Sequence, residues 1–475
     1  MRVAKNASFL LSGNLLNKIL SFLMGILLAN YLGPEGYGKY TYAFALVTLF
    51  VFVPDLGIPQ LTVREVAREK GLANKYLANS ILFRGIISLL VAGVLIGVVL
   101  VLEDSRETIY LVAFISLSLV FISISSSFEV ICSAFERMQY RALMSNLKNV
   151  LLLAGVGLII FLRRGLIEVG ILYLTTCALV AGLFYLVMRI RIIKPKLEID
   201  LEFWKSLVKR GLPFALAGIF FTVYFKIDSV MLRFIRGNEE VGLYNAAYNL
   251  IYALSFIPAS VTAAIFPRLS EDYIYDRGSL RLGVEKSLKY LWLISLPLTV
   301  GGSLLSKSII LSIYHHNYLL SVAIFQILIL GLVLIWINMC MYVSLKSVDK
   351  QLVVTKISGS GCLFNIGLNS FMIPLWGARG AAMATLLTEV AMLTFSFHYF
   401  SKYILRPRLS PLMSRPLIAV ALMSPVTFYL RGSPLWLTIL LSASVYLFAL
   451  LLLGGISPEE RRFFLALLGS RREVR

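Results

Sequence analysis

Long apolar stretches dominate the chain and alternate with short polar segments. Most of these stretches reach about 20 residues, the length that a helix needs to cross a bilayer. Because the polar segments are short, the pattern predicts an all-α polytopic membrane protein with about 14 transmembrane helices. We expect these helices at residues 8–32, 40–62, 78–102, 108–134, 142–162, 166–188, 211–235, 241–266, 288–312, 319–344, 351–374, 378–400, 412–430 and 434–455.

The composition supports this interpretation and excludes several other classes of protein. Of the 475 residues, 59% are hydrophobic and 15% are charged, whereas soluble domains have about 25% charged residues. A cytosolic enzyme, a nucleic-acid-binding domain and a disordered protein are therefore excluded, and we expect no nucleic acid as a partner. The four cysteines all lie in apolar stretches, where we expect them to pack as small apolar side chains.

The net charge of +20 indicates how the chain is oriented in the membrane. Polytopic membrane proteins concentrate Lys and Arg in their cytoplasmic loops. Here most of the 45 Lys and Arg residues lie in the two tails and in the loops on one side of the predicted helices. We therefore expect a multi-pass protein of the cell membrane with both termini in the cytoplasm and no cleavable signal peptide.

The chain also resembles itself at a spacing of 204 residues. The segment Gly38–Ala43 aligns with Gly242–Ala247, and each is followed by an apolar helix with a late proline, Pro54 or Pro258. Six helices in each repeat preserve the orientation, so the halves are parallel repeats with a substrate path between them. We expect an N-lobe at 1–190 (helices 1–6), a C-lobe at 191–400 (helices 7–12), and helices 13 and 14 with a basic cytoplasmic tail at 401–475.

Several motifs follow one another along the chain: Tyr31–Tyr40, Asp55–Gly57, Asp228–Leu232, Val241–Ala247, Phe266–Ser270, Asn369, Ile373, Pro374 and Gly377–Ala382. Together they resemble the motifs of the polysaccharide transporter family, the Wzx-type lipid-linked oligosaccharide flippases. This family belongs to the multidrug/oligosaccharidyl-lipid/polysaccharide exporter superfamily. The resemblance covers nearly the whole chain, with residues 8–400 matching well.

The resemblance implies a fold and a function that hydropathy alone does not give. It implies two six-helix lobes that form a V-shaped cleft and open alternately to the two faces of the membrane. It also implies transfer of a polyprenyl-diphosphate-linked oligosaccharide from the cytoplasmic to the outer leaflet, for assembly of a cell-surface glycan. The partners would then be the lipid-linked oligosaccharide and membrane lipids, and we expect the protein to be a monomer.

Five basic residues lie inside the predicted helices, where charge is costly and usually faces a cavity. Lys18 and Lys226 are deep and occupy similar places on the repeat-related helices 1 and 7. We expect them to face the path and to bind the diphosphate; the alternative is a nearby acid or carbonyl that neutralises each. Arg84, Lys148 and Lys356 lie nearer the cytoplasmic ends, where they either bind substrate too or extend to the headgroups.

Polar side chains on the predicted helices 7, 11 and 12 suggest a cation site. Asp228, Asn365, Asn369 and Thr385 offer carboxylate, amide and hydroxyl oxygens, which are ligands that hard cations prefer. The related lipid II flippases have a cation site between the same three helices, so the resemblance implies Na⁺ or H⁺ as a coupling ion, with no other cofactor. The alternative is that the four residues make hydrogen bonds between helices.

Two rival functions fit the sequence less well. A cation-coupled multidrug exporter of the same superfamily would favour an acidic cavity, whereas the basic residues inside these helices predict a cationic one. A membrane glycosyltransferase would need a long outer loop or a soluble domain with acidic metal ligands, and the sequence contains neither. We therefore expect that the protein is not an enzyme.

Overall fold

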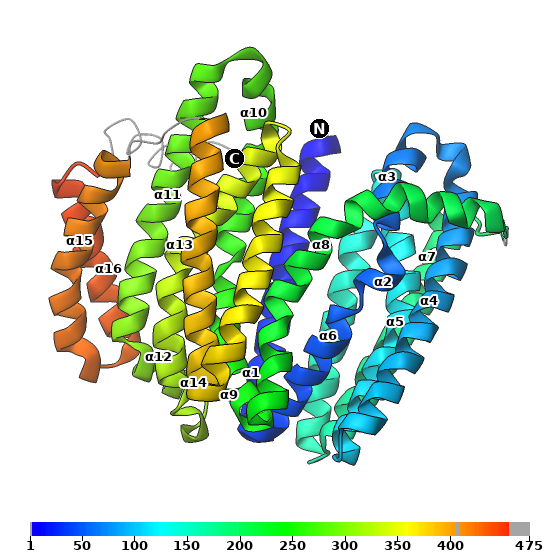
Figure 1. The fold of residues 1–475 in the computed structure, drawn as a ribbon, viewed down its shortest axis with the longest axis horizontal. Coiled ribbons are helices and arrows are strands. Elements are labelled where there is room, and N and C mark those ends of the chain that lie inside the picture. The colour runs from blue at the N-terminus through cyan, green and yellow to red at the C-terminus, as the bar shows by residue number, and fades with distance from the viewer. Residues whose placement is uncertain (1, 197, 405–408, 456–475) are drawn as a thin grey trace, which may run out of the picture. The chain divides into compact units, whose positions relative to one another are not determined.

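The computed structural model describes residues 2–196, 198–404 and 409–455, and all of their regular elements are helices (Figure 1). Short 3₁₀ turns lie at Lys70–Leu72, His316–Tyr318 and Leu430–Gly432. The α-helices are α1 Arg2–Leu49, α2 Phe52–Asp55, α3 Ile58–Arg68, α4 Ala73–Leu102, α5 Arg106–Ala134, α6 Met138–Phe161, α7 Leu166–Arg191, α8 Leu201–Arg236, α9 Asn238–Leu254, α10 Phe256–Tyr275, α11 Arg277–Leu304, α12 Ser306–Ile313, α13 Ser321–Ser347, α14 Gln351–Tyr403, α15 Leu409–Tyr429 and α16 Leu435–Leu452.

Two of these helices are each two helices joined at a glycine. Gly33 in α1 has φ 68° and ψ 176°, and Gly377 in α14 has φ 56° and ψ −134°. Such positive φ values suit glycine, because a side chain would be strained there. The predicted breaks after residue 32 and before residue 378 are therefore confirmed. The helix resumes directly at Pro34, however, so the loop expected at 33–39 is wrong.

The helices of the structure are compatible with the predicted number of membrane crossings, but they do not determine that number. Among the described residues, ten helices are long and apolar enough to cross a membrane, or eleven if the bent pair α11 and α12 forms one span. Two of the ten contain the kinks at Gly33 and Gly377. The 36-residue helix α8 is not among them. A total of fourteen crossings is therefore compatible with the structure.

Three predicted helices are interrupted. The helix expected at 241–266 is divided between α9 and α10 at Ser255. The helix expected at 40–62 is divided among α1, α2 and α3, because Leu56 and Gly57 have φ values of 39° and 72°. The helix expected at 288–312 bends by 80° between α11 and α12. These segments are apolar enough on average to be predicted as single helices, so hydropathy alone does not reveal the breaks.

The contacts divide the chain into two compact units. Unit 1 comprises Met1–Phe256, Tyr314–Ser321 and Thr355–Ala384. Its core includes side chains of α3, α4, α5, α7 and α8, among them Leu61, Tyr76, Phe128 and Phe184. The start of α8 is held by Asn79, whose side-chain oxygen accepts hydrogen bonds from the Trp204 indole and the Asp200 amide, each at 2.9 Å. The lobe boundaries expected at residues 190 and 400 stay a prediction.

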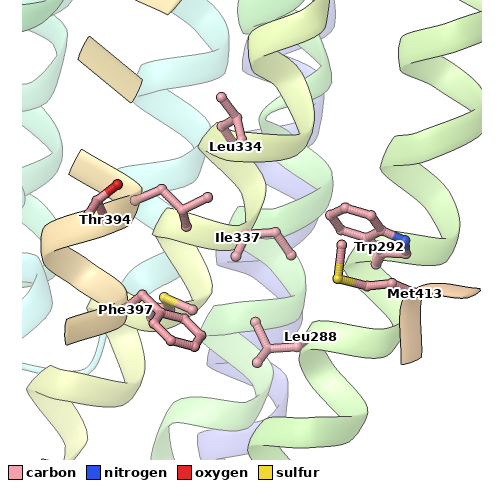
Figure 2. A pocket seen from close by; sticks show the side chains of 9 residues that line it. Leu288, Trp292, Leu334, Ile337, Thr394, Phe397 and Met413 are labelled. Atoms are coloured by element: carbon pink, nitrogen blue, oxygen red, sulfur yellow. The ribbon is translucent and has the colours of Figure 1, made fainter. Parts of the chain in front are cut away.

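Unit 2 comprises Ile257–Ile313, Val322–Val354 and Thr385–Arg475. In it α15 and α16 lie side by side, joined by a hydrogen bond from Thr427 to Ser442 at 2.8 Å (Figure 1). The unit also contains an apolar cavity of about 480 Å³ (Figure 2).

Candidate functional site

Lys18 lies on the first half of α1, between α6 and α9. The neighbouring Asn17 fixes the α6 side, because it donates to Ser145 Oγ at 2.8 Å and accepts from Asn149 Nδ2 at 2.7 Å. On the α9 side, Lys18 Nζ lies 5.5 Å from the centre of the Tyr252 ring. Lys18 is half-buried and makes no ion pair with any carboxylate of the described residues.

Lys226 lies on α8, and the residue next to it also lies near Tyr252. The ring of the adjacent Phe225 lies 6.3 Å from that of Tyr252, which is itself half-exposed. Lys226 is half-buried, and within the described ranges it has no ion-pair partner. The helices of both predicted diphosphate ligands therefore meet at one aromatic residue of unit 1. A lysine without a carboxylate inside a membrane-spanning helix is costly, which favours an anionic ligand.

The other three predicted substrate ligands differ in their surroundings. Arg84 is buried and pairs with Asp55, and it also donates to Ser127 Oγ at 3.0 Å and to Ser126 Oγ at 3.2 Å. Lys148 is half-buried and Lys356 is exposed. The pairing of Arg84 is typical of a structural group, because a buried charge needs a partner. Substrate binding by these three residues stays a prediction.

Three of the four predicted cation ligands lie together in a buried network. Asp228 is 5% exposed. One of its carboxylate oxygens accepts from Asn369 Nδ2 at 2.6 Å, and the other accepts from the Tyr244 hydroxyl at 2.6 Å. Asn369 Nδ2 also donates to Asn365 Oδ1 at 3.0 Å. Thr385 is buried in unit 2, so its part in the predicted site stays a prediction.

The network combines features of a hydrogen-bond cluster and of a cation site. Asn369 directs its NH₂ group to the carboxylate of Asp228. Its oxygen and the nitrogen of Asn365 are buried and have no hydrogen-bond partner among the described residues. Turning the Asn369 amide by half a turn would direct two oxygens, its own and that of Asp228, to one point. Carboxylate and amide oxygens are the ligands that hard cations prefer, and cation binding by Asp228, Asn365, Asn369 and Thr385 stays a prediction.

Tyr244 belongs to this network and was not among the predicted site residues. It lies in the segment Val241–Ala247, whose small residues predict close helix packing rather than a polar contact. A tyrosine next to small residues gives no sign that its hydroxyl will reach a carboxylate 16 positions away. The repeat gives no hint either, because Tyr40, at the position matching Tyr244, packs against Tyr37 and Phe44.

The two repeat motifs contact each other through their glycines. A Cβ atom at Gly38 would overlap the Asn238 carbonyl of α9, and a Cβ atom at Gly242 would overlap the Pro34 carbonyl of α1. These contacts are equivalent under the spacing of 204 residues, so α1 and α9 meet in a pseudo-two-fold arrangement. At the end of α8, Arg233 pairs with the buried Glu103 at 2.6 Å.

These features define a multi-pass helical membrane protein. A family model described as polysaccharide biosynthesis protein matches residues 3–272, which is more than half of the chain. The chain therefore belongs to the polysaccharide biosynthesis protein family. A second family model, MatE, matches residues 213–371.

Individual relatives agree with this assignment. The chain is 24% identical over 398 residues to a protein of Shigella flexneri whose name describes an O-antigen transporter, covering 81% of this chain and 94% of that one. It is 25% identical over 170 residues to a protein of Haloferax volcanii whose name describes it as the flippase AglR, covering 35% of each. Its fold is similar to that of the lipid II flippase MurJ in an inward closed conformation, with a TM-score of 0.78 and 20% identity over 93% of this chain and 97% of that one.

Proposed function

We propose that this protein is a flippase that moves a polyprenyl-diphosphate-linked oligosaccharide from the cytoplasmic to the outer leaflet. Its membership of the polysaccharide biosynthesis family and the flippases and transporters among its relatives support this function. The observation that carries the proposal is a pair of half-buried lysines without carboxylate partners among the described residues, Lys18 on the candidate membrane span of α1 and Lys226 on α8.

The diphosphate linker of such a substrate is the group that these lysines suit. It carries about two negative charges, and a hydrogen bond between two charged groups is about twice as strong as one between neutral groups. The sugars would pass through the polar path, while the polyprenyl chain would stay in the lipid. No bond of the substrate is made or broken, so the proposed activity is transport rather than catalysis. The proposed transporter is a monomer.

We test this function by substituting the two lysines separately. Lys18→Ala and Lys226→Ala should each reduce the flipping of lipid-linked oligosaccharide in proteoliposomes at least tenfold, because each removes a cation that faces the diphosphate. The amount of folded protein in the membrane should not change. Lys18→Arg should keep most of the activity, whereas Lys18→Glu should lose it.

The exposed Lys286 on α11 supplies the matched control, and Lys286→Ala should flip at the rate of the wild type. Full activity of the double variant with alanine at 18 and 226 would disprove the role of the lysines in diphosphate binding. Lack of flipping by the wild-type protein for any lipid-linked oligosaccharide would disprove the flippase function itself.

The flippase function also requires a defined orientation. We propose that the protein lies in the cell membrane with both termini in the cytoplasm, as the loop charges indicate. A single cysteine in place of Lys196 should then be shielded from an impermeant thiol reagent added to intact cells, and one in place of Asp104 should react. Labelling at 196 and protection at 104 would reverse the orientation.

Alternating access would require the contacts between α1, α8 and α9 to separate during the cycle. The contact of Gly38 with Gly242 holds α1 to α9 in the present state, and the Glu103–Arg233 pair holds α8 to the end of α4. Binding of Na⁺ or H⁺ at Asp228, Asn365, Asn369 and Thr385 is our proposal for the driving ion.

A cation-coupled multidrug exporter is the second candidate, and the match of residues 213–371 to the MatE model favours it. Such an exporter would have to accept cationic drugs beside Lys18 and Lys226, which would repel them. Cells that express the protein should therefore show no increase in resistance to cationic dyes and drugs. A reproducible increase that Lys226→Ala leaves intact would favour the exporter.

A further inference from the structure

Unit 2 contains an apolar cavity that the proposed transport path does not use. We call it the unit-2 cavity; it has a volume of about 480 Å³ and lies among α11, α13, α14 and α15 (Figure 2). Its lining is apolar except for Thr394, whose hydroxyl already donates to the Val390 carbonyl at 2.9 Å. The lining residues are Leu288, Trp292, Leu334, Ile337, Met341, Leu393, Thr394, Phe397 and Met413.

The contents of the cavity follow from this lining. A buried water molecule needs two to four polar partners. In the part of the chain that the structure describes, the lining offers one buried polar atom without a partner, Trp292 Nε1. Water is therefore a poor occupant of this apolar space. Because the surrounding helices lie in a membrane, the hydrocarbon chains of lipids are available to fill the cavity.

Beside the cavity lies a pair of cations. Lys350 Nζ and Lys402 Nζ lie 4.9 Å and 5.5 Å from the centre of the Tyr403 ring. Neither lysine pairs with a carboxylate of residues 2–196, 198–404 or 409–455. Tyr403 follows the lining residue Phe397 by six residues on α14, which is about 9 Å along the helix at 1.5 Å per residue.

The charges around this end of unit 2 are positive on balance. Lys346, in the last turn of α13, is exposed and adds a third cation. The exposed Asp349 contributes a single negative charge. An apolar cavity beside a group of lysines is the arrangement that basic pockets between membrane helices use to bind anionic lipids.

We propose that the unit-2 cavity holds one acyl chain of an anionic membrane phospholipid, whose phosphate lies against Lys350 and Lys402. At about 30 Å³ for each atom-sized group in a liquid, the cavity holds roughly sixteen groups, which is the size of one fatty acyl chain. A polyprenyl chain is several times longer and would not fit. This lipid is a bound component of unit 2 and is separate from the transported substrate.

Quenching of Trp292 fluorescence tests the proposal, because this side chain lines the cavity. The full-length protein is reconstituted in phosphatidylcholine vesicles with increasing mole fractions of phosphatidylglycerol, and the acyl chains of one lipid or the other are brominated. The contribution of Trp292 is the difference between the wild type and Trp292→Phe. We expect half-maximal quenching of Trp292 at a mole fraction about tenfold lower for phosphatidylglycerol than for phosphatidylcholine.

Two kinds of variant separate the headgroup from the chain. The double variant Lys350→Gln with Lys402→Gln should remove the preference for phosphatidylglycerol, and Lys286→Gln, an exposed lysine on α11, should keep it. Ile337→Phe fills the cavity and should remove saturable quenching by both lipids. Its control is Leu330→Phe, on the same helix at a site 48% exposed, which should behave as the wild type.

Equal quenching curves for the two lipids, or a preference unchanged by the double lysine variant, would overturn the proposal. Relief of the quenching by substoichiometric polyprenyl diphosphate would also overturn it, because the occupant would then be a substrate tail. If Ile337→Phe does not fold, the lysine variants, which alter the surface alone, still decide the outcome. None of these results depends on whether the protein flips an oligosaccharide.

Discussion

Asp200 is the residue before α8, and it connects the start of α8 to Lys75 on α4. Its side chain accepts from the Phe203 amide at 2.9 Å, as an N-cap does, and from Lys75 Nζ at 2.7 Å. The hydrogen bond from Lys75, together with that from the Phe203 amide, holds the pKa of the Asp200 carboxyl below its usual range. A carboxylate whose pKa is lowered by folding stabilises the folded state at any pH where it is charged.

We expect Asp200→Asn to lower the thermal unfolding midpoint slightly at pH 7, because asparagine keeps the N-cap and removes the charge. The contribution of Asp200 is complete above its unfolded pKa of about 3.9 and is lost as the pH falls through the lower folded value. The midpoints of the wild type and the variant in detergent should therefore converge between about pH 5 and pH 2.

Asp200→Ala is the companion variant, because it removes the cap as well as the charge and should stay less stable than the wild type at every pH. Parallel midpoints for the wild type and Asp200→Asn down to pH 2 would contradict the stabilising role of the charge.

At the level of single residues, sequence reasoning identified side chains better than it identified their partners. Asp228, Asn365 and Asn369 could be grouped because two of them are one turn apart and all lie in apolar helices. The pairing of Arg84 with Asp55 depends on how α4 packs beside α2, and no spacing in the sequence contains that information. The same holds for Tyr244, which reaches Asp228 only through the packing of α8 on α9.

Helices α1 and α9 approach each other closely enough that their backbones touch. Gly38 and Gly242 make this possible, since a side chain at either position would overlap a carbonyl of the other helix. In a bilayer, small residues of this kind drive association, because helices gain little from burying apolar surface away from lipid.

We expect Gly38→Val to lower the stability by about 1–3 kcal/mol or to force the two helices apart, as overpacking does. Thermal unfolding in detergent measures the loss, and cysteine crosslinking between α1 and α9 measures the separation. Gly97→Ala is the control, because Gly97 lies on α4 with nothing near its missing Cβ. Unchanged stability and unchanged crosslinking of Gly38→Val would show that the contact does not hold α1 to α9.

Among the helices, the kinks and the repeat could be predicted, whereas the internal breaks could not. Gly33 is followed directly by Pro34, and Gly377 lies three residues after Pro374, and both features are visible in the sequence. The break at Leu56 is different, because a leucine with positive φ is rare and only tertiary packing stabilises it. The fold class and the repeat follow from hydropathy and motif spacing, which packing does not alter.

For the molecule as a whole, we consider what drives the transport cycle. We expect an ion to act at the hydrogen-bond network of Asp228, Asn365, Asn369 and Tyr244. An ion shifts the balance between two conformations only by the difference in its affinity for them. A tenfold difference in affinity is worth about 1.4 kcal/mol, enough to reset a nearly balanced transporter. The Asn369 oxygen is buried and has no hydrogen-bond partner among the described residues, and we expect a bound ion to contact it.

We expect an inward or outward Na⁺ gradient to change the flipping rate of the wild-type protein in proteoliposomes and Asp228→Asn to abolish that dependence. Binding of the lipid-linked oligosaccharide should persist, because Lys18 and Lys226 lie outside the network. Asp272→Asn is the control, since Asp272 pairs with Arg268 at 3.0 Å on α10 and should keep the ion dependence. If the wild type is indifferent to Na⁺ and to a proton gradient, Asp228 serves Tyr244 and Asn369 as a hydrogen-bond acceptor alone. Its replacement should then lower the unfolding midpoint and leave the flipping rate of the folded protein unchanged.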